Sequence, residues 1–365
     1  MKIVIDGRML DWTGIGRYTR ELLNHLQTLD PVNDYQVLLA KSGFESWQPS
    51  ADNFSKVIAD FPAYSLAEQT RLHGLLKKLR SDLVHFTHFT VPLAYSGCSV
   101  VTVHDLTMTK YSTRRGDSAL ARLKYRGKQT GMNVAIRRAL SQANQIITPS
   151  QFVRDQISDD YKVSPTKITV TYEAAESQWP SPMPYSALSA QKFVLYVGNA
   201  YPFKNLGRLT EAFAGLDVAD CKLVLVGKTD HFYSQLEKSV RAAGLQNIVF
   251  TGFVPDDQLA WLYRNATAFI FPSLSEGFGL PGLEAMAHGL PVIASNTSCL
   301  PEVYGEAAHY FDPNDTADMA AKISEVIHNE ELRNKLSGAG LQRVKEFSWK
   351  KLAEQTLEVY RKALG

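Results

Sequence analysis

The sequence predicts an α/β protein with two doubly wound domains, each built on a parallel sheet that is covered by helices on both faces. Short apolar runs rich in β-branched residues alternate with longer amphipathic stretches, which is typical of βαβ units. The alternation stops in a segment rich in Pro and Ser at 177–191 and then starts again. The chain has 365 residues, more than one ordinary core accommodates. We therefore expect two similar domains that face each other across a cleft.

The first domain is expected at 1–178. Its candidate strands are short apolar runs at 2–7, 35–40, 83–89, 99–105, 145–150 and 167–173. Amphipathic helices are expected between them at 14–29, 66–80 and 130–143.

The linker is expected at 179–190 and the second domain at 191–347. Candidate strands of the second domain lie at 193–200, 222–227, 247–252, 267–273, 291–295 and 307–313. Helices are expected at 205–216, 255–266, 282–289, 316–340 and 348–365.

Composition excludes several classes of protein. The formal net charge is +2, which gives no reason to expect nucleic acid as a partner. The three cysteines are far apart and form no metal-binding or disulfide pattern, so we expect reduced thiols in a cytoplasmic protein and no metal site. No leader-like start is present, and no apolar run reaches the roughly 18–20 residues that a membrane span needs.

A glycine-containing loop follows the first strand. Gly14 and Gly16 precede the first helix, where glycine lets backbone N–H groups approach an anion. A complete dinucleotide fingerprint is absent because Thr19 stands in the place of its third glycine. A loop that faces substrate and a plain tight turn both remain open at this point.

His104 and Asp105 lie just past an apolar strand, at the edge where open α/β sheets bind ligands. The alternative is that the pair only caps the next element. His85 and His88 also follow a strand, but their spacing in an extended segment does not direct both rings at one metal ion.

In the second domain, Lys204 stands where a loop meets a helix. Helix starts disfavour cations, so a lysine in this place favours an anionic ligand such as a phosphate over a purely structural role.

The most informative stretch, SEGFGLPGLEAMAHGLP, begins at Ser275 and runs from a loop into a helix. We expect the backbone from Gly277 to Gly282 to present several N–H groups to a diphosphate. Glu276 precedes the loop, and Glu284 is expected on the first helical turn, where both carboxylates are suited to bind vicinal sugar hydroxyls. The alternative is two acidic helix caps, which leaves the glycines between them unexplained.

This stretch resembles the donor-site signature of the retaining glycosyltransferases of family four, which have the two-domain GT-B fold. The two glutamates have the spacing of that signature. The segments DGRML, TGIGRYTREL, VTVHDL, TPSQFVRDQI, VGNAYPFKNL and TGFVPDDQLAWLYRNA are similar to other family segments and occur in the family's order.

The resemblance implies a role for each residue of the signature. Glu284 is expected to bind the ribose of a nucleotide sugar, and Glu276 the hydroxyls of the transferred sugar. Backbone contacts to the sugar and diphosphate are expected from Gly277, Phe278, Gly279 and Leu280.

The resemblance assigns roles elsewhere as well. Lys204 neutralises the diphosphate, and His104 lies over the sugar near the anomeric carbon. Gly14 and Gly16 let the first domain approach the phosphates, and Val254 lies beside the base. The helix at about 348–365 is expected to return to the first domain.

One position departs from the family pattern. Asn199 stands where many members carry an arginine that is paired with the lysine, so the diphosphate lacks a usual cation. Lys228 or Arg208 could compensate, or the dipoles of the loop could carry more of the charge.

The implied reaction is a front-face substitution in which the departing phosphate accepts the proton of the acceptor hydroxyl. It needs no metal ion and no cofactor beyond the nucleotide-sugar co-substrate. The segments DGRML and VTVHDL resemble mannosyltransferases of bacterial polysaccharide assembly, which implies GDP-mannose as donor; a UDP-linked sugar stays open.

The acceptor is expected to be a saccharide or a lipid-linked saccharide. Residues 110–138 contain nine lysines and arginines and one acidic residue, and three further cations lie at 77–80. Such runs are either solvated helix faces or a surface that docks on an anionic membrane, and we favour peripheral contact with the inner face of the membrane.

Three other classes share parts of this pattern. A non-hydrolysing nucleotide-sugar epimerase has the same architecture but gives no reason for the paired glutamates. A dehydrogenase needs the complete glycine fingerprint. A non-catalytic nucleotide-sugar-binding protein remains an alternative if the missing arginine is disabling.

Overall fold

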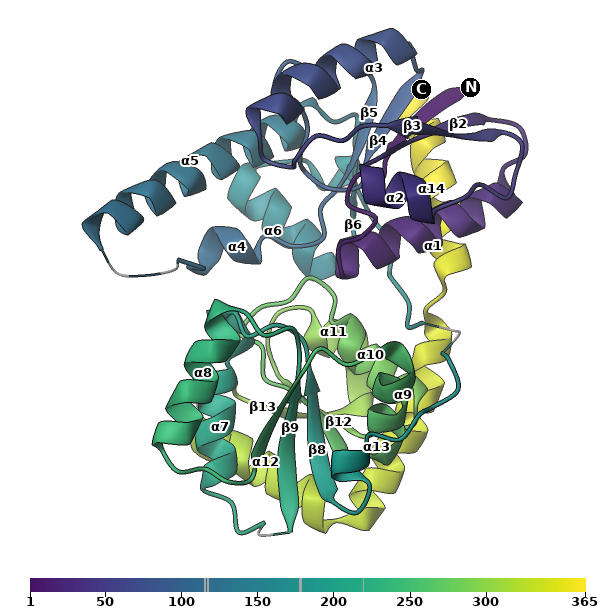
Figure 1. Ribbon diagram of the computed structural model, residues 1–365. Helices are drawn as coiled ribbons and strands as arrows, with labels where there is room; N and C mark the ends of the chain where they lie inside the picture. The colour runs from purple at the N-terminus through teal and green to yellow at the C-terminus, as the bar shows by residue number, and fades with distance from the viewer. Residues whose placement is uncertain (115, 117, 177–178, 219) are drawn as a thin grey trace. The chain divides into compact units, whose positions relative to one another are not determined.

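The computed structural model describes residues 1 to 365 except 115, 117, 177, 178 and 219. The chain forms two compact units, each built on its own sheet (Figure 1). Unit 1 consists of Met1–Thr109, Gly116–Glu173 and Ser348–Gly365; unit 2 consists of Lys110–Arg115 and Ala174–Phe347. The predicted domain boundary at residue 178 lies outside the described residues.

Unit 1 is built on a parallel sheet with the order β3-β2-β1-β4-β5-β6-β7. Its strands are β1 (Lys2–Asp6), β2 (Asp34–Leu39), β3 (Phe54–Ile58), β4 (Leu83–Phe86), β5 (Ser99–Thr102), β6 (Gln145–Thr148) and β7 (Ile168–Val170). Every strand predicted in this part of the chain is present. The sequence prediction missed β3, an edge strand whose apolar run is interrupted by Ser55 and Lys56.

Helices cover both faces of this sheet (Figure 1). The helices in this part of the chain are α1 (Gly14–Leu29), α2 (Lys41–Ser46), the π-helical turn η1 (Glu68–Leu72), α3 (His73–Leu79), α4 (Thr107–Lys110), α5 (Ala119–Gln142), α6 (Gln151–Tyr161), η2 (Pro165–Lys167) and α14 (Trp349–Leu364). Alternate strand residues, among them Val4, Val84 and Ile146, pack into one core with α3, α5 and α6. Because successive side chains of a strand point to opposite faces, their neighbours face α1 and α14.

The α14 helix is fastened to the first sheet by buried polar contacts. His85 on β4 contacts the Tyr360 hydroxyl through Nδ1 (2.7 Å) and the Thr102 hydroxyl through Nε2 (2.8 Å). The Cys98 thiol donates to the Ala363 carbonyl. Burial, with a smaller effect from His104, lowers the pKa of His85 to about 3, so this ring is neutral at ordinary pH and serves as a structural contact.

Unit 2 is built on a six-stranded parallel sheet with the order β10-β9-β8-β11-β12-β13. Its strands are β8 (Lys192–Val197), β9 (Cys221–Val226), β10 (Ile248–Gly252), β11 (Ala268–Phe271), β12 (Val292–Ser295) and β13 (Ala308–Phe311). All six coincide with predicted strands, and the predicted α/β, doubly wound fold class is confirmed.

The helices of unit 2 are η3 (Ser186–Leu188), η4 (Pro202–Lys204), α7 (Leu206–Ala214), α8 (His231–Ala242), α9 (Asp256–Asn265), α10 (Leu280–Ala287), α11 (Leu300–Tyr304), η5 (Gly305–Ala307), α12 (Thr316–His328), α13 (Glu330–Arg343) and η6 (Val344–Glu346). The single helix predicted at 316–340 is wrong. Asn329 takes an extended conformation there, and its side chain accepts from the Leu332 N–H (2.9 Å), so it ends one helix and caps the next. Within the described part of the chain, no helix combines the length and the apolarity needed to cross a membrane.

Candidate active site

Both sheets have a point where the strand order reverses. In unit 1 it lies between β1 and β4, and in unit 2 between β8 and β11. Loops that leave neighbouring strands in opposite directions open a crevice at the carboxyl ends of those strands, and open α/β sheets bind their ligands there. In unit 2 the two loops in question carry Lys204 and Glu276.

Lys204 and Glu276 form an ion pair at this point of unit 2. The Lys204 Nζ atom lies 2.6 Å from Glu276 Oε1, and the two side chains are only 12% and 13% exposed. The backbone joins the same two loops, because the Leu274 N–H donates to the Phe203 carbonyl (2.8 Å). The Lys204 ammonium group also lies over the ring of Phe271, 5.3 Å from its centroid. The sequence predicted separate roles for the lysine and the glutamate and gave no sign that they pair.

Two glycines at the start of α10, Gly279 and Gly282, have a packing role that the sequence did not reveal. The Tyr304 hydroxyl donates to the Gly279 carbonyl (2.6 Å). A Cβ atom on Gly279 would lie 2.5 Å from that hydroxyl, and one on Gly282 would overlap it. Gly279 also has a φ of +95°, which a residue with a side chain rarely adopts. Both glycines therefore make room for Tyr304.

Two positions at the start of α10 present no free backbone donor. Pro281 has no N–H, and the Gly282 N–H donates to the Gly279 carbonyl (3.1 Å). That the stretch from Gly277 to Gly282 presents several N–H groups to a diphosphate stays a prediction for its other positions.

Glu284 lies on the second turn of α10, so its predicted place on the first turn is wrong. The side chain is buried, and its Oε2 atom accepts from the hydroxyl of Tyr263 on α9 (3.0 Å). Tyr263 thus sets the orientation of the carboxylate. Phe278 and Leu280 beside it are also buried, and the Phe278 ring meets Phe347 edge-on.

The other residues predicted on the donor side also lie in unit 2. Asn199 is exposed after β8, and its Oδ1 atom accepts from the Tyr201 N–H (3.3 Å), which shapes the turn before η4. Val254 is buried in the loop after β10. The two cations considered as substitutes for the missing arginine differ: Arg208 donates to the Asn205 side chain (3.2 Å), whereas Lys228 is exposed.

The two glycines of the first loop differ as well. A Cβ atom on Gly16 would overlap the Leu10 carbonyl, so this glycine lets α1 approach the loop after β1. Gly14 is exposed at the first position of α1, with open space around it.

His104 lies at the carboxyl end of β5 in unit 1 and is held at both ring nitrogens. Its Nε2 atom donates to the Thr87 carbonyl (3.0 Å), and its Nδ1 atom lies 3.0 Å from Glu173 Oε1. The ring of Tyr18 packs edge-on against it, 4.8 Å between centroids. The sequence analysis missed Glu173, although a glutamate as the last residue of a predicted strand was a visible signal.

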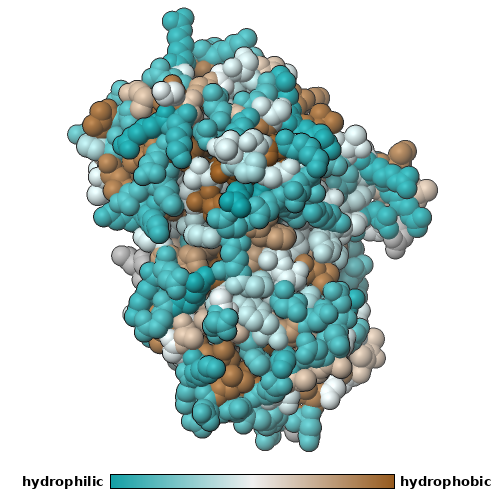
Figure 2. Space-filling model, turned by 180° about the vertical axis from the view of Figure 1, so that it is seen from behind, coloured by the Kyte–Doolittle hydropathy of each residue, from teal (hydrophilic) through white to brown (hydrophobic). Residues whose placement is uncertain are grey.

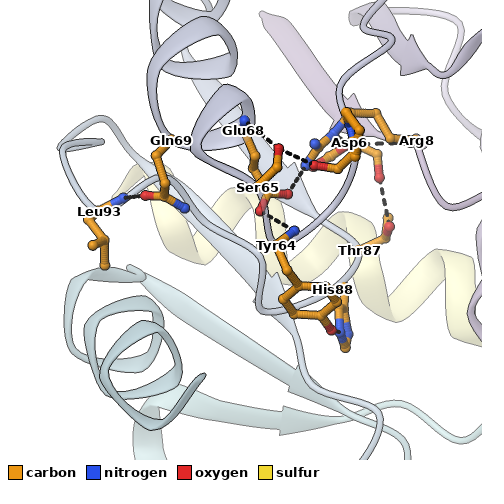
Figure 3. A network of polar contacts seen from close by, with 10 residues as sticks. Asp6, Arg8, Tyr64, Ser65, Glu68, Gln69, Thr87, His88 and Leu93 are labelled. Atoms are coloured by element: carbon orange, nitrogen blue, oxygen red, sulfur yellow. Dashed lines mark hydrogen bonds and ion pairs between the residues drawn. The ribbon is translucent and has the colours of Figure 1, made fainter. Parts of the chain in front are cut away.

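A buried charge cluster near His104 was also missed. The Arg8 guanidinium donates to both carboxylate oxygens of Asp6 (2.8 and 2.7 Å) and to Glu68 Oε1 (2.8 Å), as Figure 3 shows. All three side chains are buried. Burial alone would lower the pKa of Arg8, but the two carboxylates outweigh it and raise the pKa. An Asp-x-Arg at the end of the first strand was the only sequence signal.

No group of three or more His, Cys, Asp or Glu side chains in the described ranges is arranged to hold a metal ion. His88, like His85, is buried, and burial lowers its pKa to about 3.

Two family descriptions match the chain. "Glycosyltransferase Family 4" matches residues 12–176, and "Glycosyl transferases group 1" matches residues 184–343. The first match carries His104 and the first glycine loop; the second carries Lys204 and both glutamates.

Curated relatives and solved structures agree with these matches. O-antigen chain mannosyltransferase B of Escherichia coli is 28% identical over 99% of this chain and 100% of its own length. O-antigen chain mannosyltransferase RfbU of Salmonella typhimurium is 27% identical over 70% of this chain and 67% of its own. The HepE protein of Anabaena, solved in complex with UDP-glucose, has a TM-score of 0.78 over 99% of both chains at 17% identity. With two Rossmann-like sheets and family matches that together extend over most of its length, the protein belongs to the family 4 glycosyltransferases, which have the GT-B fold.

Proposed function

We propose that the protein transfers a mannosyl residue from GDP-mannose to a saccharide or lipid-linked acceptor in polysaccharide assembly, with retention of configuration and without a metal ion. The observation that carries the proposal is the placing of Lys204, Glu276 and the start of α10 where the second sheet reverses its strand order. Two relatives named as O-antigen mannosyltransferases support mannose as the sugar.

In the proposed reaction, the bond between the anomeric carbon and the β-phosphate oxygen breaks, and a bond from the acceptor oxygen to the same carbon forms. The departing phosphate takes the proton of the acceptor hydroxyl on the same face of the sugar. Negative charge grows on the phosphate, and Lys204 stabilises it in a partly buried setting where electrostatic effects are strong. Glu276 and Glu284 hold the sugar and the ribose as acceptors of hydrogen bonds, and neither acts as a nucleophile.

The remaining residues have supporting roles in this proposal. His104 acts on the sugar near the anomeric carbon, with Glu173 holding its ring. Gly14 and Gly16 allow a close approach to the phosphates. The nucleobase lies against the backbone at Val254, whose side chain is buried. Because backbone contacts discriminate weakly between bases, a UDP-linked sugar is the second candidate donor, and the UDP-glucose bound by the Anabaena protein supports it.

Thermal shift measurements with GDP-mannose, UDP-glucose and UDP-galactose test the donor assignment. We expect GDP-mannose to stabilise the native chain and to lose that effect in Glu284→Gln. The exposed Glu211 on α7 provides a matched control, Glu211→Gln, which should respond like the native chain. If none of the nucleotide sugars stabilises the native protein, the donor site is misassigned. The anomeric configuration of the product, read by NMR, decides between retention and inversion.

We also propose that α5 docks on the anionic inner face of a cytoplasmic membrane. Only three residues of this helix are buried, all near its C-terminal end. Its exposed residues combine apolar and basic side chains: Leu120, Leu123, Val134, Arg122, Lys124, Arg126, Lys128, Arg137 and Arg138. Figure 2 shows hydrophilic and apolar side chains mixed on the projecting end of the helix, at the right of that view.

A cavity of about 630 Å³ near the C-terminal end of α5 supports the membrane proposal. Its lining includes the cations Arg137, Arg138, Lys162 and Lys167, and no acidic residue. It lies by the amino ends of β6 and β7, away from His104, so its charge suits a phosphate headgroup. Sedimentation with vesicles of anionic phospholipid at low salt should capture the protein, and capture should fail with neutral vesicles. If the protein binds neither the anionic nor the neutral vesicles, the docking proposal is contradicted.

A further inference from the structure

Aromatic side chains gather at the strand-order reversal of unit 1, where β1 and β4 end. His88 follows β4 and is buried, while Trp12 and Tyr64 beside it are 41% and 51% exposed. The Trp12 ring lies 6.3 Å and the Tyr64 ring 6.2 Å from the His88 ring, between centroids. Large aromatic side chains that stay exposed together at a ligand-binding edge provide stacking surface for a ligand.

The backbone of Tyr64 is held in a conformation that a tyrosine rarely adopts. Its φ is +59°, in the left-handed region, where a bulky residue is strained. The Tyr64 N–H donates to Glu68 Oε2 (2.8 Å), while Glu68 Oε1 accepts from Arg8, which also binds Asp6. Figure 3 shows this chain of contacts from β1 to the tyrosine. The buried charge cluster therefore maintains a strained loop that exposes an aromatic ring.

The polar groups near these rings suit hydroxyl groups better than phosphate. The Tyr64 hydroxyl contacts His88 Nε2 (2.7 Å), and among the described residues no partner is found for the buried Nδ1 atom of His88. Arg8 is balanced by two carboxylates. The charge of Asp105 also acts on Tyr64. Acidic groups thus outnumber the cation of the cluster, which disfavours an anionic ligand and provides acceptors for hydroxyls.

Thr87, next to His88, joins the carboxyl end of β1 to His104. The Thr87 hydroxyl donates to the Asp6 carbonyl (2.7 Å), and the Thr87 carbonyl accepts from His104 Nε2 (3.0 Å). A ligand stacked on Trp12 and Tyr64 would therefore lie at the same edge of the first sheet as His104.

We propose that Trp12 and Tyr64, which pack against the buried His88, form a stacking platform for a neutral pyranose ring of the acceptor. The inference rests on the proposed glycosyltransferase function and deepens it, because it identifies the group that unit 1 recognises as a sugar rather than the phosphate of a lipid carrier.

Saturation-transfer NMR on the full chain with methyl α-mannopyranoside tests the platform without any reaction. We expect transfer to the mannoside in the native chain, its loss in Trp12→Ala, and substantial recovery in Trp12→Phe. Leu66→Ala is the matched control, because Leu66 is 84% exposed and lies two residues from Tyr64. It should bind like the native protein.

Kinetics with the same mannoside and GDP-mannose give a second readout. Trp12→Ala should raise the acceptor KM by about tenfold or more, with the Kd for GDP-mannose unchanged. Equal mannoside binding by the native chain and Trp12→Ala overturns the platform, and so does displacement of the mannoside by inorganic pyrophosphate. Lack of product with every donor, together with mannoside binding that requires Trp12, instead overturns the proposed function and leaves the platform standing.

Discussion

Lys204 and Glu276 neutralise each other across 2.6 Å at the strand-order reversal of the second sheet. Each comes from a different connection, so the contact joins the segments that follow β8 and β11. In the proposed reaction, a diphosphate that binds Lys204 would compete with this carboxylate. The glutamate would then set how strongly the lysine holds the nucleotide, in addition to the contact proposed for it with the sugar.

Changing Glu276 should affect nucleotide binding in the direction opposite to changing Lys204. Glu276→Gln removes the competing charge, so we expect GDP to bind several-fold more tightly by calorimetry, while transfer falls by about 10²–10³-fold. Lys204→Met should weaken GDP binding and transfer together. Lys335→Met, at an exposed cation on α13 of the same unit, is the control and should change GDP affinity less than about twofold. If Glu276→Gln and Lys204→Met weaken GDP binding equally, Glu276 does not compete with the diphosphate for Lys204.

Gly282→Ala should destabilise unit 2, because the new methyl group overlaps the Tyr304 hydroxyl. We expect the free energy of unfolding to fall by about 1–3 kcal/mol in chemical denaturation. Gly338→Ala is the matched control: it lies in α13 with open space around it and should stabilise by about 0.5–1 kcal/mol. A native-like stability of Gly282→Ala would show that Tyr304 moves aside at no cost.

These glycines illustrate what the sequence could predict and what it could not. Alternating apolar and amphipathic runs are local, so the strands of both sheets could be found from sequence, apart from the half-exposed edge strand β3. The motif from Ser275 to Pro291 also pointed to a ligand site. The partner of Gly279 and Gly282 is Tyr304, which follows them by more than 20 residues and meets them only in the folded chain.

Pairings between distant polar residues could not be predicted from the sequence for the same reason. Glu276 meets Lys204 across 72 positions and Arg8 meets Glu68 across 60, and no local pattern encodes either contact. Helix boundaries were also missed where one side chain decides them: Asn329 divides α12 from α13, and the actual start of α10 moves Glu284 to the second turn.

Acid should destabilise unit 1 through its buried histidines. His85 and His88 have pKa values of about 3 in the folded protein, against 6.5 for an ordinary histidine. Between those pH values the unfolded chain binds more protons, so stability falls as pH drops below about 6.5. We expect each histidine to remove ~2 kcal/mol from the free energy of unfolding between pH 7.5 and 5.

The histidine variants provide the check on this prediction. His85→Gln and His88→Gln should each weaken the dependence of stability on pH, measured by denaturation with urea at several pH values. His288 in unit 2 makes a similar contribution, since burial and Arg264 lower its pKa to about 4, so only the difference between variants and native chain is informative. If the stability of both variants depends on pH as steeply as that of the native chain, the assignment of the acid sensitivity to His85 and His88 is contradicted.

Arg8→Met should be severely destabilising, because it leaves Asp6 and Glu68 buried without their cation. We expect a loss of about 3–5 kcal/mol in the free energy of unfolding. Arg154→Met, which breaks the solvent-exposed pair with Asp155, is the control and should cost less than about 1 kcal/mol. If Arg8→Met and Arg154→Met both lower the free energy of unfolding only slightly, the charge cluster of Asp6, Arg8 and Glu68 is more hydrated than its burial indicates.

The position of α14 has a consequence for how the protein is made. This helix packs on the first sheet, where Tyr360 and Ala363 form hydrogen bonds with His85 and Cys98. It is nevertheless translated after all the strands of the second sheet. A ribosome adds about 5–20 residues per second, so the nascent first sheet waits many seconds with an apolar face uncovered. During that interval it is a natural client for chaperones, whereas the second sheet folds from one nearly continuous stretch of chain. Truncation or a premature stop near residue 348 would therefore damage the domain that was synthesised first.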